Sequence, residues 1–323
     1  MHTEHGQTME LRHLRSFVAV ADSGSISMAA RRLNVTQPAL SRQIQDLERD
    51  MGVRLFDRIG RRVILTGDGG DLLGRTRRVL ADVDALQGRA RALGGGEGGI
   101  LRIGAPPQFI ESALPEVLAA YRRARPGVEV QLVEDGANPL LRRVQHGELH
   151  LAVGVLRGEE GFQSRLLYPL RVLAVMSRGH RFAGRKSLRV TDLANETILM
   201  LAKGFQTREL FEEACQAAQL EPHVLLESRS PQSLVALAQA GLGVAIVPSV
   251  VKLDLSRIAL AGLVHDGRPL GRWARVAWDS RRYLPSYAAE FIEELAKYMK
   301  RSYPGHRLKS TRDIARPRDT LVR

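Results

Sequence analysis

Five of the six residues from 94 to 99 are glycine, and this run divides the chain of 323 residues into two parts. Glycine loses more conformational freedom than any other residue on entering a helix or strand, so residues 94–99 are expected to form a hinge. Before the hinge, apolar residues recur at helical spacing; after it, short apolar runs alternate with helical patterns. The sequence therefore predicts a helical N-terminal part joined to a larger α/β part.

The N-terminal part predicts three helices in its first fifty residues. Apolar residues from Leu11 to Ala21 lie at helical spacing, and Gly24 closes that helix. Ser27 is expected to cap a short second helix, and Thr36 to cap a third helix that ends at Gly52. A short helix, a tight turn and a longer helix with a polar face are the arrangement of a DNA-binding helix-turn-helix.

The third helix has an apolar and a polar face. Leu40, Ile44, Leu47 and Met51 form the stripe that is expected to be buried. The other face carries glutamine, serine and arginine, side chains that bond base edges or phosphates in the major groove of double-stranded DNA. The alternative is a small three-helix bundle whose polar face is only solvated. The residues predicted to contact DNA here are Ser27, Arg31, Arg32, Thr36, Gln37, Pro38, Ser41, Arg42 and Gln45.

Residues 55–66 predict a two-stranded hairpin that turns at Gly60. Its tip carries Arg58, Arg61 and Arg62, which are expected to touch the DNA backbone or minor groove as a wing. The hairpin favours DNA binding over the solvated bundle. Residues 9–66 are therefore predicted to be a winged helix-turn-helix domain.

Residues 67–93 predict one long helix that pairs with its copy. Leucine or valine recurs every seven positions from Leu72 to Leu93, and a second seam position follows four residues after the first three of them, as in a coiled coil. The alternative is a helix packed on its own domain. The glycines at 67–71 suggest a phosphate-binding loop, but Asp68 and Asp71 would repel phosphate. The residues predicted to form the dimer are Leu72, Val79, Val83, Leu86, Ala90 and Leu93.

Several segments of the N-terminal part together resemble the LysR-type transcriptional regulators, and the order of the later parts extends the resemblance to about Lys300. The segments are Leu14–Phe17, Ser25–Ala30, Leu33–Ser41, Leu47–Glu48, Leu55–Arg58 and Leu65–Thr66. The resemblance implies a regulator that binds DNA as a dimer or tetramer, responds to a small-molecule effector and has RNA polymerase as a further partner. The fold class expected is α+β followed by α/β: a winged helix-turn-helix, a dimerisation helix and two α/β lobes similar to periplasmic binding proteins.

Beyond the hinge, strands alternate with helices, which indicates a mostly parallel sheet with helices on both faces. The resemblance implies a first lobe of residues 100–168 plus 272–300 and a second lobe of residues 169–271. Turns that follow strands and open helices would line the cleft between them and favour a polar or anionic effector. Gln108 and Ala137 depart from the serine or threonine common in the family, which argues against a plain carboxylate clamp. The residues predicted to bind the effector are Pro107, Gln108, Phe109, Ala137, Asn138, Lys203, Phe205, Gln206, Ser230, Val247 and Pro248.

The formal net charge of +13 is not confined to the DNA-binding region. Residues 1–66 carry +3, whereas residues 301–323 carry +5. Net charge by itself argues only for non-specific binding to a polyanion. The basic tail, residues 301–323, is polar and is expected to be disordered.

Other classes of function lack their signatures. There is no Gly-x-Ser-x-Gly, Walker A or His-Glu-x-x-His pattern, so we expect no catalytic residues, no cofactor and no enzyme. Gly147 interrupts the helix between His146 and His150, which disfavours a metal site, and the single Cys215 is expected to be a core residue. Neither a leader nor an eighteen-residue apolar stretch occurs, so we expect no membrane partner and a cytoplasmic location. The alternatives left open are an α/β enzyme with an accessory DNA-binding head and an architectural DNA-binding protein.

Overall fold

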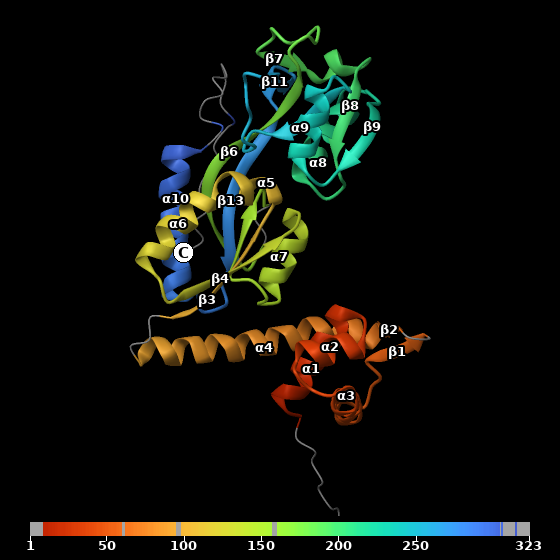
Figure 1. Ribbon diagram of the computed structural model, residues 1–323, viewed down its shortest axis with the longest axis vertical. Helices are drawn as coiled ribbons and strands as arrows, with labels where there is room; N and C mark the ends of the chain where they lie inside the picture. Colours follow the sequence, from red (N-terminus) through yellow and green to blue (C-terminus); the bar gives the residue numbers. More distant parts are fainter. Residues whose placement is uncertain are drawn as a thin grey trace, which may run out of the picture. The chain divides into compact units, whose positions relative to one another are not determined.

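The structure is a computed structural model that describes residues 9–59, 62–94, 98–156, 160–303, 305 and 314. The chain forms two units. The first holds the described residues up to Leu93 together with Gln145–Glu148, and the second holds the other described residues. The first unit is mainly helical, and the second is built on a large sheet of parallel and antiparallel strands (Figure 1). This division follows the change in pattern at the glycine run.

The first unit packs its helices and hairpin around Phe17. This side chain is fully buried and meets Phe56 edge to face, with ring centroids 5.4 Å apart. Val20, Leu40 and Leu47 complete the same core, so the first helix, the third helix and the hairpin share one interior. The elements are α1 (Leu11–Ser23), α2 (Ile26–Arg32), α3 (Gln37–Met51), β1 (Phe56–Ile59), β2 (Arg62–Leu65) and α4 (Gly67–Leu93).

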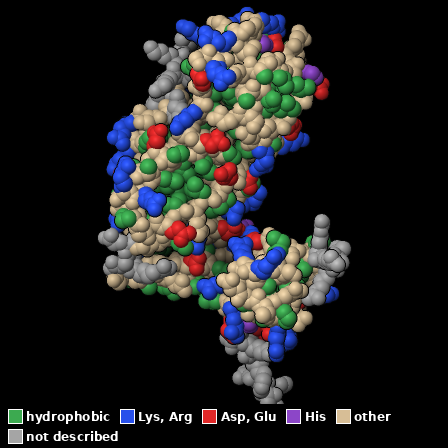
Figure 2. All heavy atoms as spheres, viewed as in Figure 1, with side chains coloured by type: hydrophobic (Ala, Val, Ile, Leu, Met, Phe, Trp, Pro, Cys, Tyr) green, Lys and Arg blue, Asp and Glu red, His purple; other side chains and the backbone are tan. Residues whose placement is uncertain are grey.

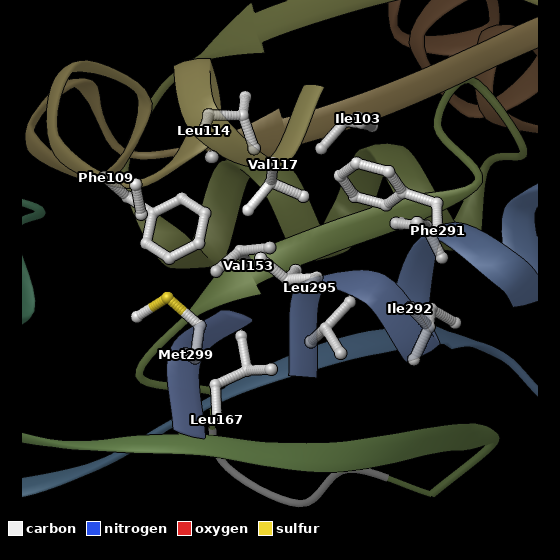
Figure 3. Packing of buried hydrophobic residues seen from close by; sticks show 14 of the residues in the cluster. Ile103, Phe109, Leu114, Val117, Val153, Leu167, Phe291, Ile292, Leu295 and Met299 are labelled. Atoms are coloured by element: carbon white, nitrogen blue, oxygen red, sulfur yellow. The ribbon is translucent and has the colours of Figure 1, made fainter. Parts of the chain in front are cut away.

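The first lobe of the second unit has helices on both faces of its sheet. Figure 3 shows Phe291 and Leu295 of α10 beside Val117 of α6 and Val153 of β5, all in one hydrophobic core. Leu140 of α7 lies in a separate core on the other face. The elements of lobe 1 are β3 (Gly99–Ala105), α5 (Pro107–Ser112), α6 (Leu114–Ala124), β4 (Val128–Glu134), α7 (Ala137–Gln145), β5 (Leu151–Gly154), β13 (Gly271–Asp279) and α10 (Ser286–Ser302).

The second lobe repeats this layering because alternate strand residues point to opposite faces. Ile198 and Met200 of β8 belong to the core that includes α8, whereas Leu199 and Leu201 belong to the core that includes α9. The elements of lobe 2 are β7 (Ser187–Arg189), the 3₁₀ helix η1 (Val190–Leu193), β8 (Thr197–Leu201), α8 (Gln206–Ala217), β9 (His223–Ser228), α9 (Pro231–Gln239), β10 (Val244–Pro248), β11 (Ile258–His265) and β12 (Arg268–Pro269).

One long strand, β6 (Phe162–Ser177), belongs to both lobes (Figure 1). The strand order along the main path is β4-β3-β5-β13-β6-β10-β8-β9. Up to Arg171, β6 pairs with β13; from Val172 onward it pairs with β10. The chain returns to lobe 1 at Gly271, which pairs with Arg171. The lobes therefore exchange strands at 171/172 and 270/271, three residues and one residue from the predicted boundaries.

The C-terminal boundary also differs from the prediction. Helix α10 continues to Ser302, and Tyr303 is only 4% exposed. The prediction that the chain is disordered from residue 301 is therefore wrong for residues 301–303, because Tyr303 packs in the core of lobe 1. Gly305 is also buried and Ile314 half-buried, and the other tail residues lie outside the described ranges.

Candidate functional site

Capping side chains fix the turn between α2 and α3. Ser25, not the predicted Ser27, caps α2 by accepting a hydrogen bond from the N–H of Met28. Thr36 caps α3 by accepting from the N–H of Ala39, as predicted. Pro38 lies in the first turn of α3, where a helix has no partner for a backbone N–H. The start of α3 is thus fixed by local chemistry.

Helix α3 buries its apolar face and exposes its polar face. Leu40 and Leu47 are fully buried, whereas Gln37, Arg42 and Gln45 are exposed. Ser41 is half-buried, and the other predicted contact residues on α2 and at the start of α3 are exposed: Ser27, Arg31, Arg32, Thr36 and Pro38. The polar face is therefore accessible to a DNA groove, and the role of each residue stays a prediction.

Two side-chain hydrogen bonds hold the polar residues of α3 in place. The Ser27 hydroxyl donates to Gln37 Oε1 at 3.0 Å, which leaves the amide NH₂ of Gln37 to donate outward. The Ser16 hydroxyl donates to Gln43 Oε1 at 2.5 Å and ties α1 to α3. The sequence predicted Ser27 as a helix cap and a DNA contact but not its bond to Gln37, because a bond between residues ten positions apart leaves no local pattern.

A carboxylate joins α3 to the hairpin. Glu48 accepts hydrogen bonds from the N–H groups of Leu55 and Phe56 at 2.8 and 3.2 Å. These two donors begin the hairpin, so α3 and the strands β1 and β2 are held together by buried contacts and by this carboxylate. Of the predicted wing residues, Arg61 and the turn residue Gly60 lie outside the described residues, as do the side chains of Arg58 and Arg62.

Helix α4 changes character along its length. Leu72 is half-buried and packs against the core of the first unit, and Thr76 is 4% exposed, so this end of α4 packs at least in part on its own domain and the role of Leu72 in a dimer stays a prediction. Further along, Val79, Leu86 and Leu93 are 45%, 70% and 73% exposed. Val83 is half-buried and Ala90 exposed. A row of exposed large apolar side chains indicates an interaction surface.

The predicted effector residues fall into two groups. One group is buried: Gln108, Phe109, Ala137, Phe205, Val247 and Pro248. The other group is half-buried or exposed at the starts of helices or in turns: Pro107, Asn138, Lys203, Gln206 and Ser230. Whether either group binds an effector stays a prediction.

The two lobes touch each other at turns that carry these residues. The Arg229 guanidinium donates to the Asp135 carboxylate at 3.1 Å, which joins lobe 2 to lobe 1. Gly136 lies so close to the other lobe that a Cβ there would be 2.5 Å from the carbonyl oxygen of Gly204. Sequence reasoning placed Gly136 in a turn that lines the cleft but did not name Asp135.

One buried polar atom in lobe 1 has no hydrogen-bond partner within the described part of the chain. Gln108 is 6% exposed, and its Oε1 accepts no hydrogen bond there. Leaving such an acceptor unsatisfied costs about 1–3 kcal/mol. A polar ligand with an N–H or O–H donor would remove that cost.

Other candidate chemistry has a structural explanation. His150 Nδ1 accepts from the backbone N–H of Arg102, and burial lowers the pKa of His150 to about 4. Burial raises the pKa of the Cys215 thiol to about 12, which keeps it protonated and a poor nucleophile. No cluster of three or more His, Cys, Asp or Glu side chains with metal-binding geometry occurs among the described residues.

Positive side chains are spread over the visible face of both units (Figure 2). This agrees with the distribution of charge along the sequence, where the positive excess is not confined to residues 1–66. In the described part of the chain, no helix combines the length and apolar character that crossing a membrane requires.

Two sequence profiles of known families match the chain. The profile of the bacterial regulatory helix-turn-helix protein, lysR family, matches residues 11–70, and that of the LysR substrate binding domain matches residues 94–300. Their junction falls in α4 and the glycine run. Residues 71–93, most of α4, lie between the two matches.

Relatives align over most of their length. CbbR of Rhodospirillum rubrum, an HTH-type transcriptional regulator, is 33% identical over 277 residues, 85% of this chain and 92% of the relative. AlsR of Bacillus subtilis, also an HTH-type transcriptional regulator, is 31% identical over 249 residues, 76% of this chain and 82% of the relative.

Solved structures share the fold. Full-length CbnR in complex with its target DNA has a TM-score of 0.63 and 26% identity, covering 90% of this chain and 99% of CbnR. A variant of full-length OxyR from Pseudomonas aeruginosa has a TM-score of 0.69 at 24% identity, covering 91% and 95% of the two chains.

Proposed function

Since the chain belongs to the LysR family of DNA-binding transcriptional regulators with an effector-binding domain, we propose that its α3 face reads a specific operator and that a polar metabolite between its two lobes controls this activity. The observation that carries the proposal is the division of α3 into a buried leucine face and an exposed glutamine, serine and arginine face.

Base reading is assigned to Gln37, Ser41, Arg42 and Gln45. Arginine bonds guanine through O6 and N7, and glutamine donates to purine N7 through its amide. The Ser27 hydroxyl occupies Gln37 Oε1 and thereby orients its NH₂ outward. The exposed Arg31 and Arg32 of α2 are assigned to phosphates, which fix the position of the helix on the duplex.

Arg42→Ala tests the assignment of base reading. Selection from a randomised duplex library first gives the preferred sequence. On that duplex Arg42→Ala is expected to lose about 1–3 kcal/mol of binding free energy, while binding to random DNA changes little. The control is Arg178→Ala, which removes the same charge from an exposed site in lobe 2. Equal loss of affinity on both kinds of DNA would contradict base reading by Arg42.

The effector is proposed to be a small polar molecule that offers a hydrogen-bond donor to Gln108 Oε1. The unsatisfied acceptor and the polar turns at Asn138 and Gln206 support this choice. The test is a thermal-shift screen of the full chain against polar metabolites, because a ligand that binds only the folded state raises the unfolding temperature. A metabolite that raises the unfolding temperature of the parent chain should not raise that of Gln108→Leu, because leucine has a similar volume and no hydrogen-bond acceptor. A metabolite that raises the unfolding temperature of the parent chain and of Gln108→Leu equally would show that Gln108 does not bind it.

We further propose a homo-oligomer of dimers that contacts RNA polymerase in the cytoplasm, where bacterial DNA lies. The exposed apolar row on α4 supports self-association. The family is one of transcription regulators, and we propose that this chain has no enzymatic activity.

A further inference from the structure

The two chain crossings between the lobes lie side by side. The N–H of Val172, on the first crossing, donates to the carbonyl oxygen of Leu270, on the second, at 2.8 Å. Arg171 and Gly271 are paired in the sheet at the same level. Both connections are thus hydrogen-bonded to each other, and any rotation of one lobe against the other must take place about this line.

Ser249, the first residue after β10 of lobe 2, is bonded to the crossing on both sides. Its N–H donates to the carbonyl oxygen of Arg171 at 2.9 Å, and its Oγ accepts from the N–H of Arg171 at 2.9 Å. The Ser249 hydroxyl hydrogen is then left to bond a third group, and that group is the phenol oxygen of Tyr303.

Tyr303 bonds the other lobe as well. Its hydroxyl donates to the carbonyl oxygen of Pro169 at 3.1 Å, and Pro169 pairs with Trp273 in the sheet of lobe 1. One phenol oxygen therefore contacts a lobe 1 strand and a lobe 2 residue on either side of the crossing. Since hydrogen bonds weaken steeply with length and angle, both bonds can be satisfied in only a narrow range of lobe angles.

The ring of Tyr303 is held in lobe 1. It stacks on Tyr168 with ring centroids 4.6 Å apart, and Tyr168 stacks on Phe109 at 6.0 Å. Helix α10 brings it there, anchored by Leu295 and Met299 in the core (Figure 3). Burial raises the pKa of Tyr303 to about 12, so its hydroxyl remains a neutral donor near pH 7.

We propose that Tyr303 is a positioning residue whose hydroxyl latches the two lobes in one relative arrangement. An effector that favours this arrangement keeps the hydroxyl bonds to Ser249 and Pro169, and an effector that favours another arrangement must break them. The proposal rests on the proposed function, because it concerns the lobe motion that an effector would use. The latch works together with the Asp135–Arg229 ion pair, which joins the lobes at the turns. Removing the phenol oxygen should loosen the crossing, while its backbone hydrogen bonds and the interlobe ion pairs Asp135–Arg229, Glu116–Lys252 and Glu213–Arg272 remain.

The test uses the ligand-free full chain and Tyr303→Phe, which keeps the ring and its stack. Spin labels are placed on cysteines at the exposed positions Arg123 on α6 and Gln216 on α8, and the labelled chain is diluted with excess unlabelled chain. Loss of one or two hydrogen bonds should raise the population of other lobe arrangements roughly two- to tenfold. The distance distribution between the labels should broaden accordingly.

A matched control removes a phenol hydroxyl from the same helix. Tyr287 of α10 donates to the carbonyl oxygen of Ile100 within lobe 1, so Tyr287→Phe should leave the interlobe distances unchanged. Ser249→Ala removes the bridge from the lobe 2 side and should reproduce the broadening if Tyr303→Phe does not fold. Identical distributions in the parent chain, Tyr303→Phe and Ser249→Ala would overturn the latch. DNA binding by these variants reports separately on the proposed function, so failure of the one is distinguishable from failure of the other.

Discussion

Leu86→Glu is expected to leave the protein monomeric and to weaken its binding to the operator. Leu86 lies on α4 and is 70% exposed in the single chain, in a row with Val79 and Leu93. Pairing with a second copy would bury this row as a coiled-coil seam. Two recognition helices on one dimer then read two half-sites, which a monomer cannot do.

The size of the effect follows from symmetry. Each dimer would lose two buried leucines, worth together about 4 kcal/mol, before any cost of burying two like charges. The dimer dissociation constant should therefore rise about 1000-fold or more. Sedimentation velocity at micromolar concentration measures the monomer fraction, and titration with the selected duplex measures the loss of affinity.

Gln87→Glu is the matched control, since it adds the same charge at the next, exposed position of the same helix. It should remain oligomeric. A Leu86→Glu protein that sediments like the parent chain would show that α4 is not the dimer seam.

Gly69→Ala is expected to destabilise the first unit by about 3 kcal/mol. A Cβ at Gly69 in the first turn of α4 would overlap the carbonyl oxygen of Leu55, and a backbone atom cannot move aside as the end of a side chain can. Leu55 is fully buried and begins the hairpin, so the strain would be passed to the core around Phe17. Chemical denaturation of the full chain, followed by circular dichroism, measures the loss.

The neighbouring Gly70 provides the opposite expectation. A Cβ there would meet nothing within 4 Å, and alanine is favoured over glycine in a helix by about 1 kcal/mol. Gly70→Ala should therefore be neutral or slightly stabilising. Equal free energies of unfolding for Gly69→Ala and Gly70→Ala would refute close packing at Gly69. The same contact gives Gly69 a structural role, which phosphate binding is not needed to explain.

Features with a local cause were predictable from the sequence. Thr36 caps α3, and Gly24 and Gly52 follow α1 and α3 as expected, because capping depends on side chains within a few residues. The buried stripe of α3 followed from helical periodicity. The winged-helix and α/β character of the two parts followed from the change of pattern at the glycine run.

Features with a long-range cause were not predictable in the same way. A heptad pattern does not distinguish packing on the own domain from packing on a partner, so Leu72 was assigned to the seam although it contacts its own core. Tyr303 contacts Pro169 and Ser249, residues 134 and 54 positions away, and its polar flanking sequence resembles a free tail. The candidate effector residues depend on which turns two lobes bring together, which periodicity does not encode.

The Glu48 carboxylate bonds the N–H groups of Leu55 and Phe56. The residues that hold the DNA-binding unit together are therefore different from the residues proposed to contact the bases. The caps, the leucine stripe and this carboxylate hold the scaffold, and none of them lies on the exposed face of α3. On the proposed base reading, exchanging Gln37, Ser41, Arg42 and Gln45 as a set should retarget the protein to another operator while the scaffold stays folded.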